Sequence, residues 1–155
     1  MQRKTIYIGA DSAGYAMKEM LISSLSEEGY EVTDCGAYND ASSHYPEFAH
    51  AVCEKVQKTP DDAFGILVCG TGIGMSMAAN KHLGIRAALC GDTFSARFTR
   101  LHNNANVLCL GARVVGVGLA QDIVSAFLDA PFESGGRHEA RVNMITAIEE
   151  NERKA

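Results

Sequence analysis

The sequence contains no tryptophan, only three prolines, and no apolar run near the ~18 residues that a membrane-spanning helix needs. Its first residues also lack the apolar segment of a secretory signal peptide. We therefore expect no membrane partner and a cytoplasmic location. The chain has fewer basic than acidic residues, 14 lysines and arginines against 19 aspartates and glutamates, so its formal net charge is −5. This deficit disfavours a nucleic-acid partner, because binding to phosphate backbones depends on lysine and arginine.

Disulfide and metal-site spacings are absent as well. The chain has five cysteines: Cys35, Cys53, Cys69, Cys90 and Cys109. Their number is odd and none forms a Cys-x-x-Cys pair, so we expect reduced thiols. Residues His44, His50 and His82 do not have the spacing of metal ligands. We therefore expect no metal site.

The most informative stretch that is present is residues 66–81, Ile-Leu-Val-Cys-Gly-Thr-Gly-Ile-Gly-Met-Ser-Met-Ala-Ala-Asn-Lys. An apolar run, three alternating glycines and helix-favouring residues predict a buried strand, a tight turn and a helix start. Backbone N–H groups at such a helix start suit a phosphate or an oxyanion, and they favour a thiolate at Cys69. We therefore hypothesise that a reactive Cys69 faces an anion-binding loop.

Two simpler interpretations of this stretch stay open. A glycine-rich turn between a strand and a helix is common in α/β folds, and a cysteine at a strand end is often only a small buried apolar residue. The glycine spacing is neither Gly-x-Gly-x-x-Gly nor that of a Walker P-loop. A dinucleotide or nucleoside-triphosphate site is therefore disfavoured.

The whole chain alternates between strand and helix patterns. Strands are expected at 5–9, 30–35, 64–69, 85–90 and 106–110, and helices at about 17–27, 46–58, 74–81, 93–101, 119–127 and 138–150. A polar segment, 36–46, is expected to be a loop over a site. This alternation predicts a single three-layer, Rossmann-like α/β domain over residues 1–155, with a five-stranded, mostly parallel sheet.

Ligands in such sheets bind beyond the carboxyl ends of the strands. Asp11, Cys69, Asp92 and Gly111 all follow predicted strands, so we expect them at one edge. Asp11 could cap a helix or hold a sugar hydroxyl. At the end of a predicted helix, His102 could cap carbonyl groups or transfer protons.

A basic group begins the last predicted helix. Arg137 and Arg141 are four positions apart, and His138 lies three positions before Arg141, so the three share a helix face. With Arg113 they could bind a phosphate, because the arginine fork matches phosphate oxygens, whereas the alternative is a solvated basic face. The apolar residues of this helix are expected to pack: Val142, Ile145 and Ile148.

Taken together, the motifs resemble the ribose-5-phosphate isomerase B family, within the wider RpiB/LacAB sugar-phosphate isomerases, over roughly residues 5–150. These motifs are Gly9-x-Asp11, Tyr45-Pro46, Cys69-Gly-Thr-Gly-Ile-Gly74, Ala78-Ala79-Asn80-Lys81, Gly84-Ile85-Arg86-Ala87, His102-Asn103-Asn104-Ala105-Asn106, Gly111-x-Arg113 and Gly136-Arg137-His138-x-x-Arg141. The resemblance implies a cofactor-independent aldose–ketose isomerisation of a phosphorylated sugar. It also implies a homodimer whose active sites are each built from two subunits, with the helix at about 138–150 packing against or reaching the partner.

The resemblance further implies roles for single residues. Cys69 corresponds to the base that moves a proton between C1 and C2, and His102 to the group that opens the furanose ring. Thr71 lies in the loop that holds the enediolate oxygens. Substrate contacts are implied for Asp11, Ser12, Gly70, Gly72, Ile73, Gly74 and Asn103, and phosphate contacts for Arg113, Arg137, His138 and Arg141.

One residue departs from the family pattern. The first loop reads Gly9-Ala10-Asp11-Ser12-Ala13-Gly14, whereas the family usually has histidine at the position of Ser12. Such a loop resembles that of relatives that act on tetrose phosphates. We expect ribose 5-phosphate and ribulose 5-phosphate as substrates, and tetrose 4-phosphate, allose 6-phosphate and galactose 6-phosphate stay open. A non-catalytic sugar-phosphate sensor and a flavodoxin-type electron carrier are the alternatives from other classes.

Overall fold

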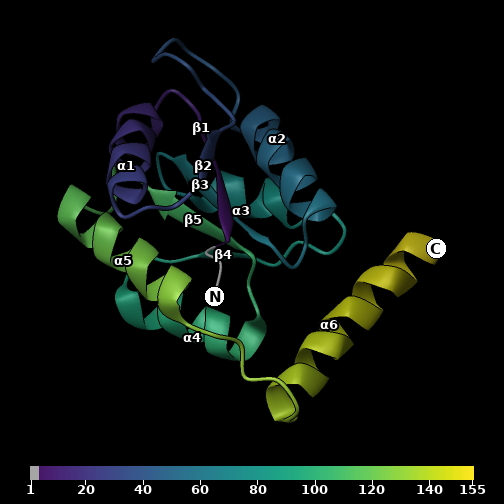
Figure 1. Cartoon of the computed structure of the whole chain (residues 1–155). Helices are drawn as coiled ribbons and strands as arrows, with labels where there is room; N and C mark the ends of the chain where they lie inside the picture. Colours follow the sequence, from purple (N-terminus) through teal and green to yellow (C-terminus); the bar gives the residue numbers. More distant parts are fainter. Residues whose placement is uncertain (1–3) are drawn as a thin grey trace.

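The computed structural model describes residues 4–155, in which strands and helices alternate up to the last two helices (Figure 1). The strands are β1 (Thr5–Ala10), β2 (Val32–Asp34), β3 (Ala63–Cys69), β4 (Ala87–Leu89) and β5 (Val107–Gly111). The helices are α1 (Tyr15–Glu27), α2 (Tyr45–Lys58), α3 (Ile73–Ala79), α4 (Thr93–Asn103), α5 (Val117–Asp129) and α6 (Arg137–Lys154).

The five strands form one sheet in the order β2-β1-β3-β5-β4. Every pair of neighbours is parallel, so the sheet is parallel throughout rather than mostly parallel. Ile8 pairs with Ile66, and Ile66 with Leu108, so apolar residues meet across the three central strands. The carboxyl ends of all strands therefore lie along one edge, as the sequence predicted.

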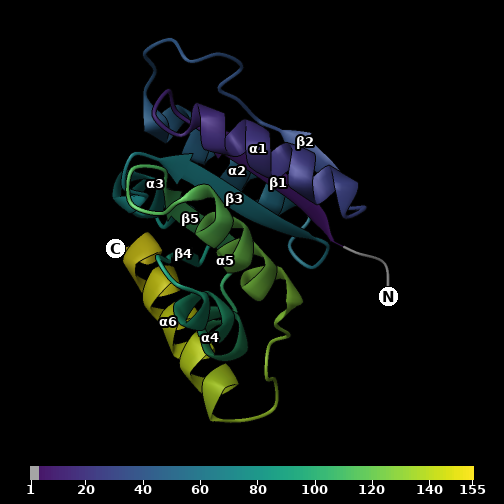
Figure 2. The same ribbon diagram turned by 90° about the vertical axis from the view of Figure 1, so that its left-hand side faces the viewer.

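Helices cover both faces of the sheet (Figure 2), and a cluster of buried hydrophobic residues lies on each face. Helices α1, α4 and α5 pack on one face, where Leu21 and Phe127 contact the core around Ile66. Helices α2 and α3 pack on the other face, where Val52 and Met75 are fully buried. Because both faces are covered, β3 is apolar and buried at all of its positions. The three-layer, Rossmann-like prediction is confirmed.

The two edge strands are shorter than their sequence patterns predicted. Strand β2 comprises Val32–Asp34 instead of 30–35, and β4 comprises Ala87–Leu89 instead of 85–90. Each edge strand has a partner on one side only, so its ends gain few ladder hydrogen bonds. All five cysteines are buried, and none is paired in a disulfide.

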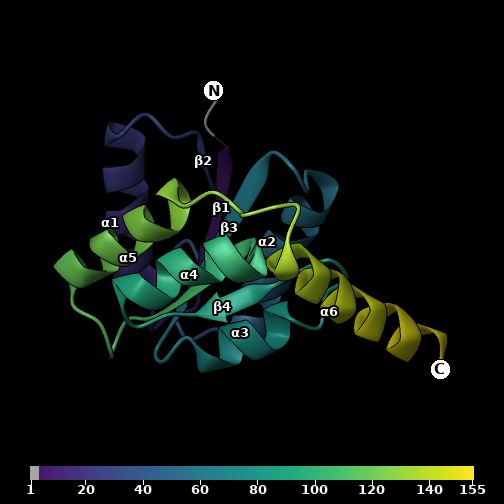
Figure 3. The same cartoon turned by 90° about the horizontal axis from the view of Figure 1, so that it is seen from below.

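Helix α6 is longer than predicted and stands apart from the layers (Figures 1 and 3). It runs from Arg137 to Lys154 and packs against α4 near its start. Val142 is its buried residue, whereas Ile145 and Ile148 are 47% and 63% exposed. The prediction that this apolar stripe packs therefore holds for Val142 but is wrong for Ile145 and Ile148 within one protomer. Further along α6, the carboxylate of Glu149 accepts from the N–H of Gly84 at 3.0 Å.

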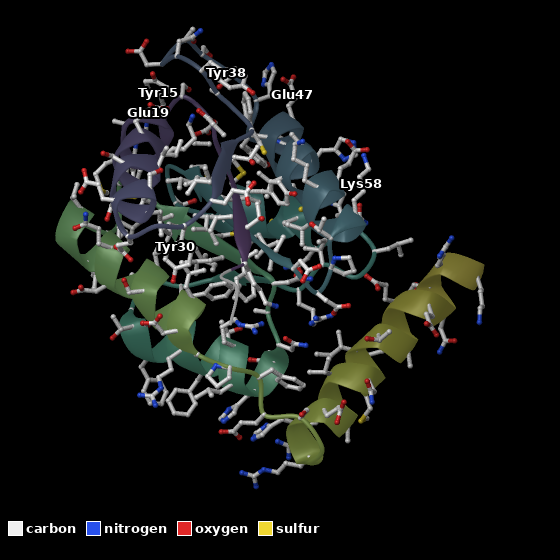
Figure 4. All side chains as sticks on the ribbon, in the orientation of Figure 1. Tyr15, Glu19, Tyr30, Tyr38, Glu47 and Lys58 are labelled. Atoms are coloured by element: carbon white, nitrogen blue, oxygen red, sulfur yellow. The ribbon has the colours of Figure 1, made fainter. Side chains whose placement is uncertain are left out.

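A buried lysine holds the carboxyl end of β2 beside the start of α1. Lys18 has no exposed surface, and its Nζ donates at 2.7 Å to both carboxylate oxygens of Asp34 and at 2.9 Å to Glu19. The rings of Tyr15 and Tyr38 lie 5.3 and 5.8 Å from the same ammonium group, and Figure 4 shows both tyrosines at one end of the molecule. This ion pair anchors the loop that leaves β2 at the edge where the site residues gather.

Within the described part of the chain, no helix combines the length and the apolar composition that crossing a bilayer requires.

Candidate active site

Cys69 is the last residue of β3 and lies at the carboxyl edge of the sheet. It is 5% exposed, and the backbone N–H of Gly72 donates to its sulfur at 3.1 Å. The sulfur therefore lies beside a backbone hydrogen-bond donor of the glycine loop. Burial raises the pKa of Cys53 to about 12 and that of Cys90 to about 11.

The glycines after Cys69 are required by close packing of the turn. Gly72 has a φ of +77°, and a Cβ there would lie 2.5 Å from the Leu89 side chain. A Cβ at Gly74 would lie 2.7 Å from the ring of Tyr45. Glycine is therefore needed for the backbone conformation and for the space, and the loop's N–H groups stay close to the thiol.

Two side chains border this loop. The guanidinium of Arg113 lies beside Gly70, since a Cβ on that glycine would be 3.3 Å from Nη1. The hydroxyl oxygen of Thr71 accepts from the N–H of Ile73 at 3.2 Å, which leaves its own O–H free to donate to a ligand. Tyr45 was not among the predicted site residues, although its Tyr-Pro pair was part of the resemblance.

The first loop meets the same edge. The N–H of Asp11 donates to the carbonyl of Val68, one residue before Cys69. The Asp11 carboxylate accepts from the N–H of Gly14 at 3.1 Å, so it closes the turn before α1. The N–H of Ser12 donates to the hydroxyl of Ser43 at 3.0 Å, which ties the first loop to the 36–46 segment.

Asp92 was expected at this edge, and its carboxylate caps helix α4. It accepts from the N–H of Ser95 at 2.7 Å and from the hydroxyl at 2.9 Å. These hydrogen bonds lower the pKa of Asp92 below its ordinary value. Asp92 is therefore engaged in holding the start of α4.

His102 and His138 form a second group, between the last turn of α4 and the first turn of α6. Their rings stack with centroids 3.9 Å apart and planes 6° apart, and the edge of Phe98 contacts His102. A cavity of about 450 Å³ has His102, Asn103, His138 and Arg141 among its lining residues. Residues far apart in sequence therefore share one pocket, at the carboxyl end of β4.

The electrostatics of this pocket disfavour the protonated form of His138. Desolvation lowers the pKa of His138, and the charges of His102 and Arg137 lower it further.

The carboxylate of Glu133, which sequence reasoning missed because no motif marks it, lies 3.8 Å from His138 Nε2. Ligand atoms of His102, Glu133 and His138 lie within 4.8 Å of one another, which would suit a cation. The neighbouring arginines oppose a cation there and favour an anion.

The thiol group and the histidine group are separate within one protomer. No hydrogen bond, ion pair or ring contact joins them among residues 4–155. Leu89 lies between them, because it would touch a Cβ at Gly72 and also lines the histidine cavity. The two halves of the predicted site therefore share a sheet edge but not a single pocket.

The fold and its edge place the chain in the class of parallel α/β proteins that bind small ligands beyond the carboxyl ends of their strands. A family model for the Ribose/Galactose Isomerase family, LacAB_rpiB, matches residues 6–145. The chain therefore belongs to this family.

Relatives with named activities cover almost the whole chain. Ribose-5-phosphate isomerase B of Escherichia coli is 47% identical over 147 residues, which are 95% of this chain and 97% of the relative. D-erythrulose-4-phosphate isomerase of Pectobacterium atrosepticum is 47% identical over 134 residues, 85% of this chain and 87% of the relative. A crystal structure of ribose-5-phosphate isomerase B from Mycoplasma genitalium with bound ribulose 5-phosphate has a TM-score of 0.92 and 42% identity, covering 97% of this chain and 99% of that one.

Proposed function

We propose that the protein interconverts ribose 5-phosphate and ribulose 5-phosphate through an enediolate, without a cofactor. The observation that carries the proposal is the thiol of Cys69, held 3.1 Å from the N–H of Gly72 in the glycine loop. Membership of the family and the similarity to ribose-5-phosphate isomerase B support the reaction type. We further propose that a single domain carries out this reaction, in the cytoplasm and as part of the pentose phosphate pathway.

Cys69 acts as the base in this proposal. Its thiolate removes the proton from C2 of the open-chain aldose and returns it to C1 of the enediolate. A positioned base contributes about 10²–10⁴-fold in rate. Backbone N–H groups of residues 70–74 and the Thr71 hydroxyl stabilise the oxygens that gain negative charge. Each such preorganised donor is worth about 3–4 kcal/mol in comparable enzymes.

The histidine group opens the ring and binds the phosphate. His102 transfers a proton at the ring oxygen as the furanose opens, and the stacked His138 fixes the orientation of its imidazole. Arg137 and Arg141, with Arg113 from the other group, hold the phosphate. Binding the phosphate away from the reacting carbons keeps the substrate in register for proton transfer.

Both groups come together in a homodimer, in which each site takes the thiol group from one protomer and the histidine group from its partner. The separation of the two groups within a protomer supports this arrangement. Helix α6 supports it as well, since Ile145 and Ile148 are exposed along a helix that projects from the body (Figure 3). Burial of such apolar side chains drives association.

A tetrose phosphate is the second candidate substrate. Ser12 is shorter than histidine and its backbone is tied to Ser43, so it has little reach toward a distal phosphate. The relative named D-erythrulose-4-phosphate isomerase is as similar to this chain, at 47% identity, as ribose-5-phosphate isomerase B of E. coli. Overall identity therefore does not choose between a four-carbon and a five-carbon sugar.

Replacing Cys69 with alanine tests the reaction. We expect kcat for ribose 5-phosphate to fall by at least about 10²-fold while the variant still binds substrate. Cys53→Ala is the matched control and should keep its activity, because Cys53 is a buried residue of α2 whose sulfur lies 4.0 Å from the carbonyl oxygen of Ala79. Unchanged turnover of Cys69→Ala would remove Cys69 as the base.

The substrate is tested by comparing kcat/KM for ribose 5-phosphate with that for erythrose 4-phosphate, both in EDTA. A preference for ribose 5-phosphate supports the pentose assignment, and the reverse preference makes Ser12 the mark of a tetrose enzyme. Loss of activity in EDTA would contradict a metal-independent reaction.

A further inference from the structure

A second cavity, of about 540 Å³, lies at the amino-terminal edge of the sheet, opposite the candidate active site. Lys4 directly precedes β1 and Arg86 directly precedes β4, and both line this cavity with Arg100 of α4. Strand β1 has six residues, so about 20 Å separates this cavity from the edge that carries Asp11. The cavity is therefore distinct from the site described above.

Arg100 is buried without a counter-ion. It is only 5% exposed, and no carboxylate of the described residues lies within ion-pair distance of it. Its Nη1 donates to the Asn104 side chain at 2.9 Å and to the Ala105 carbonyl at 2.6 Å. Its Nε is buried and has no hydrogen-bond partner among residues 4–155. A buried N–H donor without a hydrogen-bond partner destabilises the folded protein. We therefore expect an acceptor atom of a ligand at this Nε.

Arg100 stacks with its flat face on Phe64, so the edge of its guanidinium stays available to a ligand. The flat face of Arg100 lies over the ring of Phe64, with Cζ 4.5 Å from the ring centroid. Because Nη1 makes both hydrogen bonds to protein, the edge formed by Nε and Nη2 keeps its two donors. Two parallel N–H donors on one edge match the oxygens of a carboxylate or a phosphate.

The other charged groups at the cavity leave it positive. Lys4, Arg86 and Arg100 contribute three positive charges, whereas Asp61 is the one carboxylate among the lining residues. Burial and the neighbouring charge of Arg86 together lower the pKa of Arg100 to about 10. Burial and the charge of Arg100 also lower the pKa of Lys4. Each of these cations would be stabilised by an anion between them.

We propose that this cavity binds a small phosphate- or carboxylate-bearing metabolite, with Arg100 as the bidentate anchor and with Lys4 and Arg86 as further charge contacts. Phe132 and Pro131 line the same cavity and suit the carbon skeleton of such a ligand. The ligand would contact α4, the helix that also carries His102, and the segment that leads to α6.

The test uses a background that lacks two of the three arginines proposed to hold the active-site phosphate, Arg137→Ala with Arg141→Ala. The melting temperature is measured against inorganic phosphate and against citrate, with potassium chloride at equal ionic strength as the reference. At ten times its dissociation constant, a ligand that binds the folded state should raise the melting temperature by about 3–6 °C.

Two variants locate that effect. Lys4→Gln should weaken the apparent affinity for the stabilising anion about tenfold, the factor that corresponds to losing one charged contact. Lys58→Gln is the matched control, because Lys58 is exposed at the end of α2 near the same edge but does not line the cavity (Figure 4).

Stabilisation by phosphate alone identifies a phosphate ligand, and stabilisation by citrate alone identifies a carboxylate ligand. The proposal is overturned if neither anion stabilises more than chloride, or if Lys4→Gln behaves like Lys58→Gln.

Discussion

Mixing two inactive variants would show whether one active site takes residues from two protomers. Cys69→Ala removes the proposed base and His102→Ala removes the ring-opening group. Within one protomer no contact joins the two groups, so each should serve a different site of the dimer. Each variant alone has two defective sites, and we expect both to be nearly inactive on the cyclic substrate.

The magnitude follows from the two-fold symmetry of a dimer. After the variants are unfolded together and refolded, random pairing makes about half of the dimers mixed. In a mixed dimer, one site has lost both Cys69 and His102, while the other has both residues intact. We therefore expect about one quarter of the wild-type activity per mole of protein.

The assay is the initial rate on ribose 5-phosphate, or on the sugar phosphate that the purified enzyme prefers, before and after mixing. Each variant refolded by itself is the control for misfolding. Activity that stays at the level of the separate variants, in a mixture shown by mass spectrometry to contain mixed dimers, would refute the shared site, because a site within one protomer is never complete in a mixed dimer.

Three further predictions concern single residues. Gly72→Ala should destabilise the fold by about 1–3 kcal/mol in chemical denaturation, because a Cβ would meet Leu89 on a backbone with φ of +77°. Gly91→Ala, where a Cβ meets nothing within 4 Å, is its control, and equal effects would disprove the steric argument. Arg141→Ala should raise KM about tenfold or more with little change in kcat, measured by steady-state kinetics, and an unchanged KM would remove it as a phosphate contact. The lowered pKa of His138 means that the unfolded chain binds this proton first as the pH falls, so the stability due to this residue is lost as the pH falls through about 6.5. Unfolding free energies at pH 7.5 and 5.5 should therefore differ less for His138→Gln than for the unsubstituted protein, and an equal difference would contradict the assignment.

Local patterns were enough to predict most of the fold and one half of the candidate site. The strand, turn and helix around Cys69 were predictable because each depends on neighbouring residues: an apolar run, alternating glycines and a helix start. The strand–helix alternation predicted the parallel sheet and its binding edge, since parallel strands need a crossover between them. The bounds of most helices differed by one or two residues, and the two edge strands were shorter than predicted because each has a partner on one side only.

The tertiary structure decided how distant residues meet. The stacking of His102 on His138 joins α4 to α6, and no local pattern encodes that pairing. The separation of this pair from Cys69 also depends on the order of the strands, which places β4 beyond β5. The sequence pattern around Arg100 indicates only that it belongs to a helix. Its guanidinium packs on the ring of Phe64 without a counter-ion among residues 4–155, in a cavity whose lining residues extend from Lys4 to Phe132. The sequence by itself therefore determined which elements form and which residues reach the sheet edge. Only the fold determined which of those residues touch, because such contacts depend on chain segments far from each of them.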